Sequence, residues 1–208
     1  MGFYDHTGIK NDLIWSIPNF QLENKHLENC KVLKDRNSVL DNLPKHSICV
    51  ELGVEDGNFS EEIINRVDPV ELVLVDNSEE DLLKVSKRFE TNKNVITKLG
   101  DSVKIMETYN DNYFDWVYID TDHSYELTKK ELEVCSRKVK DDGHIALHDY
   151  IHFDYFGYLT REEERFFGVI KAVNDFVLDN KDYEISHLTL ESGMYNTIVI
   201  RKINGTNR

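Results

Sequence analysis

The feature that most constrains the fold of this chain is a regular alternation of short apolar segments with helix-like segments after residue 46. The β-branched segments that we interpret as strands are 47–52, 70–75, 94–99, 114–119 and 144–148. Strands that alternate with helices pair in parallel through right-handed crossovers, which leaves helices on both faces of the sheet. After a helix expected at 165–179, strands at 183–190 and 195–200 flank a short connection with glycine and predict an antiparallel hairpin. We therefore predict an α/β, Rossmann-like, doubly wound fold with a seven-stranded, mostly parallel sheet and a C-terminal antiparallel hairpin.

The N-terminal residues lack this alternation. Apolar residues between Leu22 and Leu43 recur at roughly helical spacing, which predicts one or two helices that end near Pro44. We therefore expect an N-terminal helical extension over residues 1–45 and a single α/β domain over residues 46–203.

Composition limits the compartment and the partners. No apolar run approaches the roughly 20 residues of a membrane-spanning helix, and residues 1–10 lack the layout of a signal peptide. Cys30, Cys49 and Cys135 are odd in number and have no metal-ligand spacing, which is typical of reduced thiols. We expect a cytoplasmic protein without a membrane partner. A formal net charge of −14 disfavours a nucleic-acid partner, because phosphate contacts need clustered Lys and Arg.

Glycine and aspartate follow the first two predicted strands. Gly53 and Gly57 let the backbone turn sharply after the first strand and lie close to a ligand. Asp76 ends the second strand about 20 residues later, where an acidic side chain accepts hydrogen bonds from ribose hydroxyls in folds of this type. We include its neighbour Asn77 in the same binding site.

The third predicted strand runs into Gly100, Asp101 and Ser102, which puts another carboxylate at the same edge of the sheet, within reach of an adenine amino group. Plainer interpretations stay open for these residues. The glycines suit any tight turn. Asp76 suits a helix N-cap or a loop carboxylate before Glu79, although Ser78 can cap that helix by itself, and Asp101 suits the N-cap of the next helix. A nucleoside site is favoured because the residues occur together in this order.

The stretch 50–57, the pair 75–76 and the stretch 100–102 resemble the successive cofactor motifs of class I S-adenosylmethionine-dependent methyltransferases. The resemblance covers about residues 46–202, and the C-terminal hairpin is similar to the antiparallel strand of that family. The implied contacts with S-adenosylmethionine are Glu51 near the amino-acid end, Gly53 and Gly57 beneath it, Asp76 on the ribose, and Asp101 with Ser102 beside the adenine. The sequence departs from the family at Glu55, where a further glycine is common.

Titratable side chains gather where the fourth and fifth predicted strands end. Asp120 and His123 follow the strand at 114–119, and His148 with Asp149 ends the strand at 144–148. Neighbouring parallel strands lie about 4.8 Å apart, so Asp120, His148 and Asp149 are expected to converge on one point. Carboxylate oxygens at such a point suit a divalent cation. In the alternative, His148 and Asp149 hydrogen-bond each other and shape the pocket.

These two segments resemble a subgroup of O-methyltransferases that includes macrolide-sugar and catechol-type enzymes. The resemblance implies a divalent metal, Mg²⁺ or Mn²⁺, on Asp120, His148 and Asp149, and a general base at His123. A neutral imidazole suits proton removal from a hydroxyl near neutral pH. His148 departs from the acidic or amide residue that is usual there, and imidazole is a poor ligand for Mg²⁺ but a better one for Mn²⁺. For His123, a loop position that caps the helix starting near Ser124 is the plainer interpretation.

We therefore predict an O-methyltransferase that moves the methyl group of S-adenosylmethionine to a hydroxyl of a small molecule or sugar. His123 and Asp120 are the expected catalytic residues, and Asp120 also contacts the cofactor. Two alternatives stay open: a non-catalytic binding protein with the same fold, and an NAD-dependent dehydrogenase, which would not explain the strand-end side chains or the hairpin. The N-terminal segment leaves a homodimer open.

Overall fold

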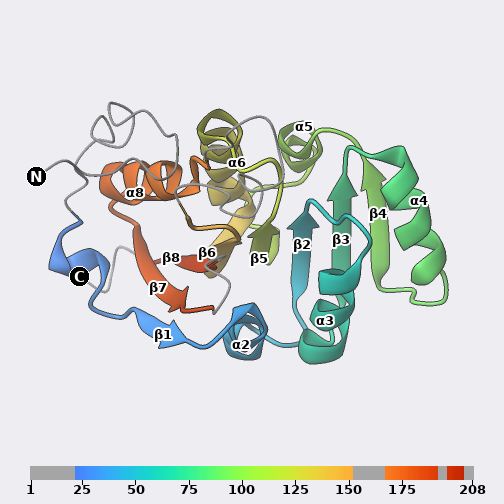
Figure 1. The fold of residues 1–208 in the computed structure, drawn as a ribbon, viewed down its shortest axis with the longest axis horizontal. Coiled ribbons are helices and arrows are strands. Elements are labelled where there is room, and N and C mark those ends of the chain that lie inside the picture. The colour runs from blue at the N-terminus through green and yellow to red at the C-terminus, as the bar shows by residue number, and fades with distance from the viewer. Residues whose placement is uncertain (1–21, 152–166, 192–195, 204–208) are drawn as a thin grey trace, which may run out of the picture.

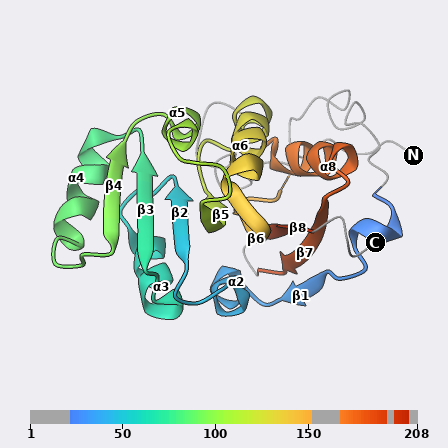
Figure 2. The ribbon, with the colours of Figure 1, turned by 180° about the vertical axis from the view of Figure 1, so that it is seen from behind.

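The computed structural model describes residues 22–151, 167–191 and 196–203, and its strands form one sheet between helices (Figures 1 and 2). The strands are β1 (Lys31–Leu33), β2 (Ile48–Leu52), β3 (Glu71–Asp76), β4 (Val95–Leu99), β5 (Phe114–Ile119), β6 (Val139–Leu147), β7 (Tyr183–Thr189) and β8 (Ile198–Lys202). The helices are η1 (Asn24–His26), α2 (Arg36–Asn42), α3 (Asn58–Val67), α4 (Glu79–Arg88), α5 (Ser102–Glu107), α6 (Tyr125–Lys138) and α8 (Val169–Asp179).

The strand order across the sheet is β1-β7-β8-β6-β5-β2-β3-β4. Strand β8 runs antiparallel to both of its neighbours, β6 and β7, and every other neighbouring pair is parallel. The α/β class, the mostly parallel sheet and the C-terminal antiparallel hairpin are thus confirmed. Because β2, β3, β4, β5 and β6 run parallel to one another, their carboxyl ends lie at one edge of the sheet.

The number of strands was predicted wrongly: the sheet has eight strands instead of seven. The additional strand is β1, which lies within the segment that we expected to be helical and pairs in parallel with β7. Val32 in β1 is 61% exposed, so its side chain belongs to no buried helical stripe. Backbone pairing with the edge of the sheet therefore decides the conformation of this short segment, and the helical prediction holds for α2. Residues 1–21 of the predicted extension lie outside the described residues.

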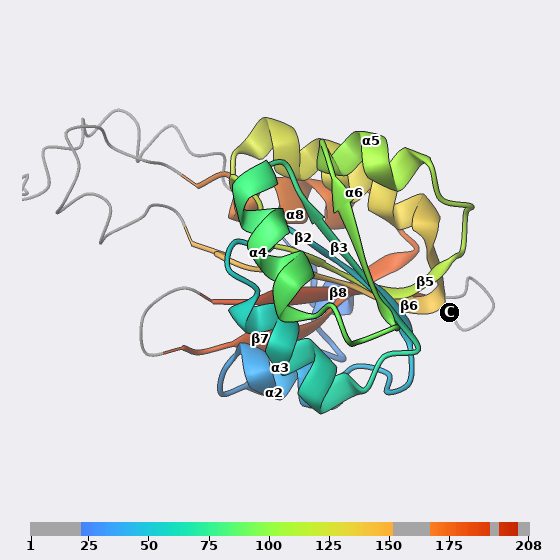
Figure 3. The same cartoon turned by 90° about the vertical axis from the view of Figure 1, so that its right-hand side faces the viewer.

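Helices cover both faces of the sheet (Figure 3), and a hydrophobic core lies between the sheet and the helices on each face. On one face, Val50 and Leu52 of β2 belong to a core that also contains side chains of α5, α6 and α8. On the other face, Cys49 of β2 and Trp116 of β5 belong to a core with side chains of α2, α3 and α4. The alternation of side chains along each strand produces both layers, since a doubly covered strand is apolar on both sides.

Polar side chains cap the helices that begin at this edge of the sheet. Ser78 accepts a hydrogen bond from the Asp81 backbone N–H, Asp101 accepts one from Lys104, and Ser124 accepts one from Leu127. The strands and these caps together fix where each loop leaves the sheet. Within the described part of the chain, none of the helices has the length and apolar character that crossing a membrane requires.

Candidate functional site

A cavity of about 660 Å³ lies at the carboxyl ends of β2, β3, β4 and β5, and we call it the main cavity. Its position is the one at which doubly wound α/β folds bind ligands. Seven of the eight residues predicted to contact the cofactor line it, together with His123: these seven are Glu51, Gly53, Asp76, Asn77, Asp101, Ser102 and Asp120. Gly57, the eighth, begins α3 and does not line the cavity.

The loop after β2 needs glycine for structural reasons of its own. Gly53 has a φ of 84°, and a Cβ atom at this position would lie 2.0 Å from the backbone oxygen of Asp120. The loop therefore packs directly on the segment that follows β5. Glu55, which stands where a further glycine is common, has a φ of 50°. The left-handed backbone of the motif is thus kept at this position without glycine.

Asp76 connects the end of β3 to the same loop. Its Oδ2 accepts hydrogen bonds from the backbone N–H groups of Val54, at 2.8 Å, and of Glu55, at 3.2 Å. Its Oδ1 accepts one from the Ser78 N–H. Because Ser78 caps α4, the plainer interpretation of Asp76 as the cap of that helix does not apply. The carboxylate orders the loop and lines the main cavity at once.

The residues after β4 include a helix cap, Asp101, and a serine that contacts a buried acid that we did not predict from the sequence. Asp101 caps α5, as its plainer interpretation held, and it also lines the main cavity. The Oγ of Ser102 donates a hydrogen bond to Glu131 of α6 at 2.5 Å, and Thr121 donates a second one at 2.9 Å. Burial raises the pKa of Glu131 to about 7. A glutamate among the buried positions of an amphipathic helix was the only signal in the sequence for this contact.

Glu51 is a buried carboxyl group in the wall of the main cavity. It is 1% exposed, and it accepts a hydrogen bond of 2.5 Å from the Oγ of Ser60. Burial raises its pKa to about 8, because the low-dielectric surroundings penalise the charged form. A buried acid of this kind is typical of sites that receive a cation.

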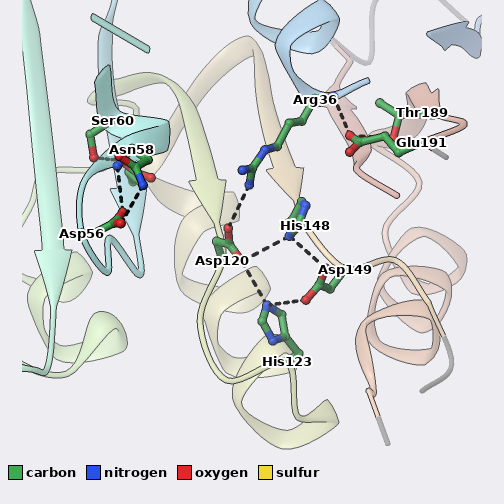
Figure 4. A network of polar contacts seen from close by, with 11 residues as sticks. Arg36, Asp56, Asn58, Ser60, Asp120, His123, His148, Asp149, Thr189 and Glu191 are labelled. Carbon is green, nitrogen blue, oxygen red and sulfur yellow. Dashed lines mark hydrogen bonds and ion pairs between the residues drawn. The ribbon is translucent and has the colours of Figure 1, made fainter. Parts of the chain in front are cut away.

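Four side chains converge where β5 and β6 end, and we call Asp120, His123, His148 and Asp149 the strand-end cluster (Figure 4). The Nε2 of His123 lies 3.1 Å from Asp120 Oδ1 and 3.4 Å from Asp149 Oδ2. The Nδ1 of His148 lies 2.9 Å from Asp149 Oδ1 and 3.4 Å from Asp120 Oδ1. One ligand atom from each of the four residues lies within 4.8 Å of the others. The predicted convergence of Asp120, His148 and Asp149 is therefore present, and His123 joins it.

The cluster is mostly buried, and its charges depend on one another. Burial alone would lower the pKa of His148, but Asp120 and Asp149 outweigh it and raise this pKa to about 9. In return, His123 and His148 overcome the effect of burial and hold the pKa of Asp120 well below its usual range. His123 and Asp149 have positive φ angles of 63° and 54°. Such left-handed backbone is unusual for these residues and is often found at functional sites.

His123 does not cap α6, because Ser124 fills that position. Its ring packs against Phe167, with 4.8 Å between the ring centroids. Its Nδ1 is buried and has no hydrogen-bond partner among the described residues. The imidazole thus turns its Nε2 toward the two carboxylates, where a proton or a cation would be held.

Arg36 is a residue of this region that sequence reasoning missed. It begins α2, and its guanidinium lies 4.7 Å from the centre of the Phe59 ring and 3.8 Å from Asp120 Oδ2. It lines the main cavity, and it also lines a second cavity of about 310 Å³ that reaches Glu191. Nothing in the spacing of the N-terminal segment indicated that this arginine meets the ends of the strands.

Comparisons with known proteins agree with this geometry. Residues 50–150 match the family model described as a methyltransferase domain. A SAM-dependent methyltransferase from Aquifex aeolicus is similar in structure, with a TM-score of 0.60, 18% identity, and coverage of 87% of this chain and 94% of that one. A methyltransferase from Streptococcus mutans, solved in complex with SAH, has a TM-score of 0.58, 18% identity, and coverage of 80% of this chain and 95% of that one.

The description of a third similar structure names its acceptor, which is a tRNA. The tRNA methyltransferase TrmK of Bacillus subtilis has a TM-score of 0.59 and 12% identity, and the match covers 83% of this chain and 67% of that one. No curated protein matches the chain in sequence. The fold therefore does not fix the acceptor by itself, while the methyltransferase description is shared by the three structures. The chain has the Rossmann-like fold of the S-adenosylmethionine-dependent methyltransferases, and its residues 50–150 match a methyltransferase domain.

Proposed function

We propose that this protein transfers the methyl group of S-adenosylmethionine to a hydroxyl group of a small molecule or a sugar. The observation that carries the proposal is the strand-end cluster of two carboxylates and two imidazoles, of which Asp120 and His123 line the main cavity while His148 and Asp149 lie behind them. Transfer to a hydroxyl needs a group that takes the acceptor proton, whereas a binding protein would have no need of one. The domain match and the structural neighbours support methyl transfer in general.

The orientation of the donor follows from the order of the strands. Asp76 at the end of β3 suits the ribose, and Asp101 with Ser102 beyond β4 suits the adenine. The amino-acid end then extends over the glycine loop of β2 toward Glu51 and Asp120. The methyl group would be presented beside the strand-end cluster.

We assign the proton transfer to His123. A proton taken by its Nε2 would lie between Asp120 and Asp149, both within 3.4 Å, and their charges would stabilise the imidazolium. Asp120 also lies where the sulfonium of the donor would be, so its charge would favour donor binding. Alignment of the acceptor oxygen with the methyl carbon and the departing sulfur accounts for the rest of the proposed rate enhancement.

The donor set of the strand-end cluster fits Mn²⁺ better than Mg²⁺. One of the three proposed ligands, His148, is an imidazole, which suits manganese and other transition metals, while Mg²⁺ prefers oxygen ligands. Asp120, His148 and Asp149 would hold such an ion, as the resemblance implied. When bound, a divalent cation lowers the pKa of a coordinated hydroxyl group. In its absence, the raised pKa of His148 keeps this imidazole protonated at neutral pH, and the side chain balances part of the charge of the two carboxylates.

The negative charge of the chain and of its main cavity disfavours a nucleic acid as the acceptor. Methylation of tRNA, the reaction of one structural neighbour, requires a surface that binds phosphates. This chain carries 39 acidic and 25 basic residues, and eight carboxylate side chains line its main cavity. A polyanion would be repelled from such a cavity, whereas neutral hydroxyl compounds would not.

Two measurements test the proposal. Calorimetric titration with S-adenosylmethionine, S-adenosylhomocysteine and NAD, each with and without Mn²⁺, should show binding of the two adenosyl ligands only. Transfer of a radiolabelled methyl group to panels of sugars and phenols should then identify an acceptor. His123→Ala should remove turnover in the transfer assay and leave the S-adenosylhomocysteine affinity from calorimetry within about twofold of the wild type. His46 is an exposed histidine at the opposite edge of the sheet, and the control variant His46→Ala should change neither turnover nor affinity.

Binding of NAD in place of the adenosyl ligands would overturn the proposed reaction. Tight donor binding with no transfer to any acceptor panel would favour a binding protein with this fold. Full activity of His123→Ala would remove this residue from the mechanism while leaving the methyltransferase assignment intact.

A further inference from the structure

Arg36 is the one Lys or Arg side chain among the described residues that line the main cavity. It comes from α2, outside the α/β alternation, and it faces a wall of carboxylates that includes Glu51 and Asp120. Its Nη1 lies 3.8 Å from Asp120 Oδ2, a long separation for an ion pair. Because a guanidinium has several N–H donors, this long contact with Asp120 leaves donors for another anion.

The position of Arg36 is fixed by several contacts. The Arg36 backbone N–H donates to the Glu191 carboxylate, and Asp35 caps the helix through the Ser38 N–H. The guanidinium lies over the face of Phe59, at a distance that suits a cation–π contact. Its side chain is 37% exposed, so a ligand in the cavity can reach it. The arginine is thus ordered before any ligand arrives, which reduces the entropy that binding would cost.

The charges at this end of the cavity match those of an amino acid attached to a sulfonium. Such a group carries two cations, the ammonium and the sulfonium, and one anion, the α-carboxylate. Asp120 supplies a negative partner, the buried acid Glu51 supplies a second acidic group, and Arg36 supplies the positive partner. A guanidinium binds a carboxylate through paired N–H groups, which fixes orientation as well as distance.

We infer that Arg36 binds the α-carboxylate of the donor and thereby positions the methyl group beside Asp120. This inference rests on the proposed function, because it presumes an adenosyl donor in the main cavity. Arg36 is then a positioning residue: it touches the cofactor far from the bond that breaks. The N-terminal segment would in this way supply a guanidinium, which the strand ends that line the main cavity do not provide.

The test compares two ligands that differ in the carboxylate alone. These are S-adenosylhomocysteine and its decarboxylated analogue, S-adenosyl-3-thiopropylamine, titrated by calorimetry into the full chain. Arg36→Ala should weaken S-adenosylhomocysteine binding by about 10- to 100-fold, the range for hydrogen bonds to a charged group, and should change binding of the analogue by less than about threefold. Arg36→Lys keeps the positive charge but not the paired N–H groups, so its affinity for S-adenosylhomocysteine should lie between those of the wild type and Arg36→Ala.

The matched control is Arg66→Ala. Arg66 is exposed to a similar degree, 35% against 37%, and pairs with Asp41 and Glu62. Arg66 itself lines neither cavity, and neither of its partners lines the main one. This variant should bind both ligands as the wild type does. If Arg36→Ala does not fold, as judged by thermal unfolding, Arg36→Lys alone carries the comparison.

Each other outcome overturns the inference in a distinguishable way. If the Arg36 variants weaken the binding of both ligands equally, or of neither, Arg36 does not bind the carboxylate, and the proposed function stands. If the wild type binds both ligands with equal affinity, the carboxylate does not contribute to binding, which also refutes the inference and leaves the proposed function standing. A rise in acceptor KM with unchanged S-adenosylhomocysteine affinity would place Arg36 in an acceptor site instead. If the wild type binds neither ligand, the proposed function and this inference fail together.

Discussion

Replacing Glu51 by glutamine is expected to stabilise the ligand-free protein at neutral pH. Burial raises the pKa of Glu51 from 4.5 to about 8. A group of this kind keeps its proton in the folded protein after the unfolded chain has released it, so the free energy of unfolding falls as the pH rises from about 4.5 to about 8 and then levels off. The free energy of unfolding changes by about 1.36 kcal/mol per pH unit over the interval from 4.5 to 7. The stability that Glu51→Gln can regain at pH 7 therefore has an upper limit of roughly 3 kcal/mol.

The assay is urea unfolding of the wild type and Glu51→Gln at pH 5, 7 and 8.5 without ligand. Glutamine keeps the shape of the protonated acid and can still accept the hydrogen bond from Ser60. The two proteins should therefore be similar at pH 5, and the variant should gain stability as the pH rises. Glu55→Gln, an exposed position in the same loop, should show no such gain. The reasoning is refuted if Glu51→Gln is no more stable than the wild type at pH 7, or if their difference does not grow with pH.

The remaining predictions concern three other features of the site. Gly53→Ala should destabilise the protein by more than about 2 kcal/mol in denaturant unfolding, because φ is 84° and the new Cβ would lie 2.0 Å from the Asp120 oxygen; an unchanged midpoint would contradict this. Glu131→Gln should flatten the pH dependence of stability between 4.5 and about 7, since burial raises the pKa of Glu131 across this interval, and an unchanged slope would refute it. Mn²⁺ should raise the melting temperature more than an equal concentration of Mg²⁺ does, and Asp120→Asn should remove the difference. Equal effects of the two ions would exclude the His148 imidazole as a ligand.

The sequence allowed the parallel sheet to be predicted because its strands are buried on both faces. Such strands appear as short apolar runs, and β2 and β5 have this character over most of their length. Strand β1 gives no such signal: it is three residues long and exposes Val32. Its conformation comes from pairing with β7, more than 150 residues away in the chain, and periodicity within the segment contains no information on this contact.

Local sequence signals also identified some residues of the site, while contacts between distant segments determined others. Residues at the ends of strands were found because parallel strands bring their carboxyl ends to one edge, so that Asp120, His148 and Asp149 had to meet. Arg36 and Glu131 were missed because they come from helices, whose docking angles decide which side chains reach this edge. Their contacts depend on packing, which the local sequence pattern does not record.

The acidity of the main cavity also suggests how a donor and its product would be distinguished. Eight acidic side chains face one arginine, and one of them, the buried Glu51, keeps its proton up to about pH 8 in the empty protein. A donor with ammonium and sulfonium charges would relieve this repulsion. Under the proposed function, methyl transfer removes the sulfonium charge, so the attraction between Asp120 and the sulfur ends with the reaction. Asp120→Asn should therefore weaken S-adenosylmethionine binding more than S-adenosylhomocysteine binding, and an equal loss for both ligands would show that Asp120 does not recognise the charge on sulfur.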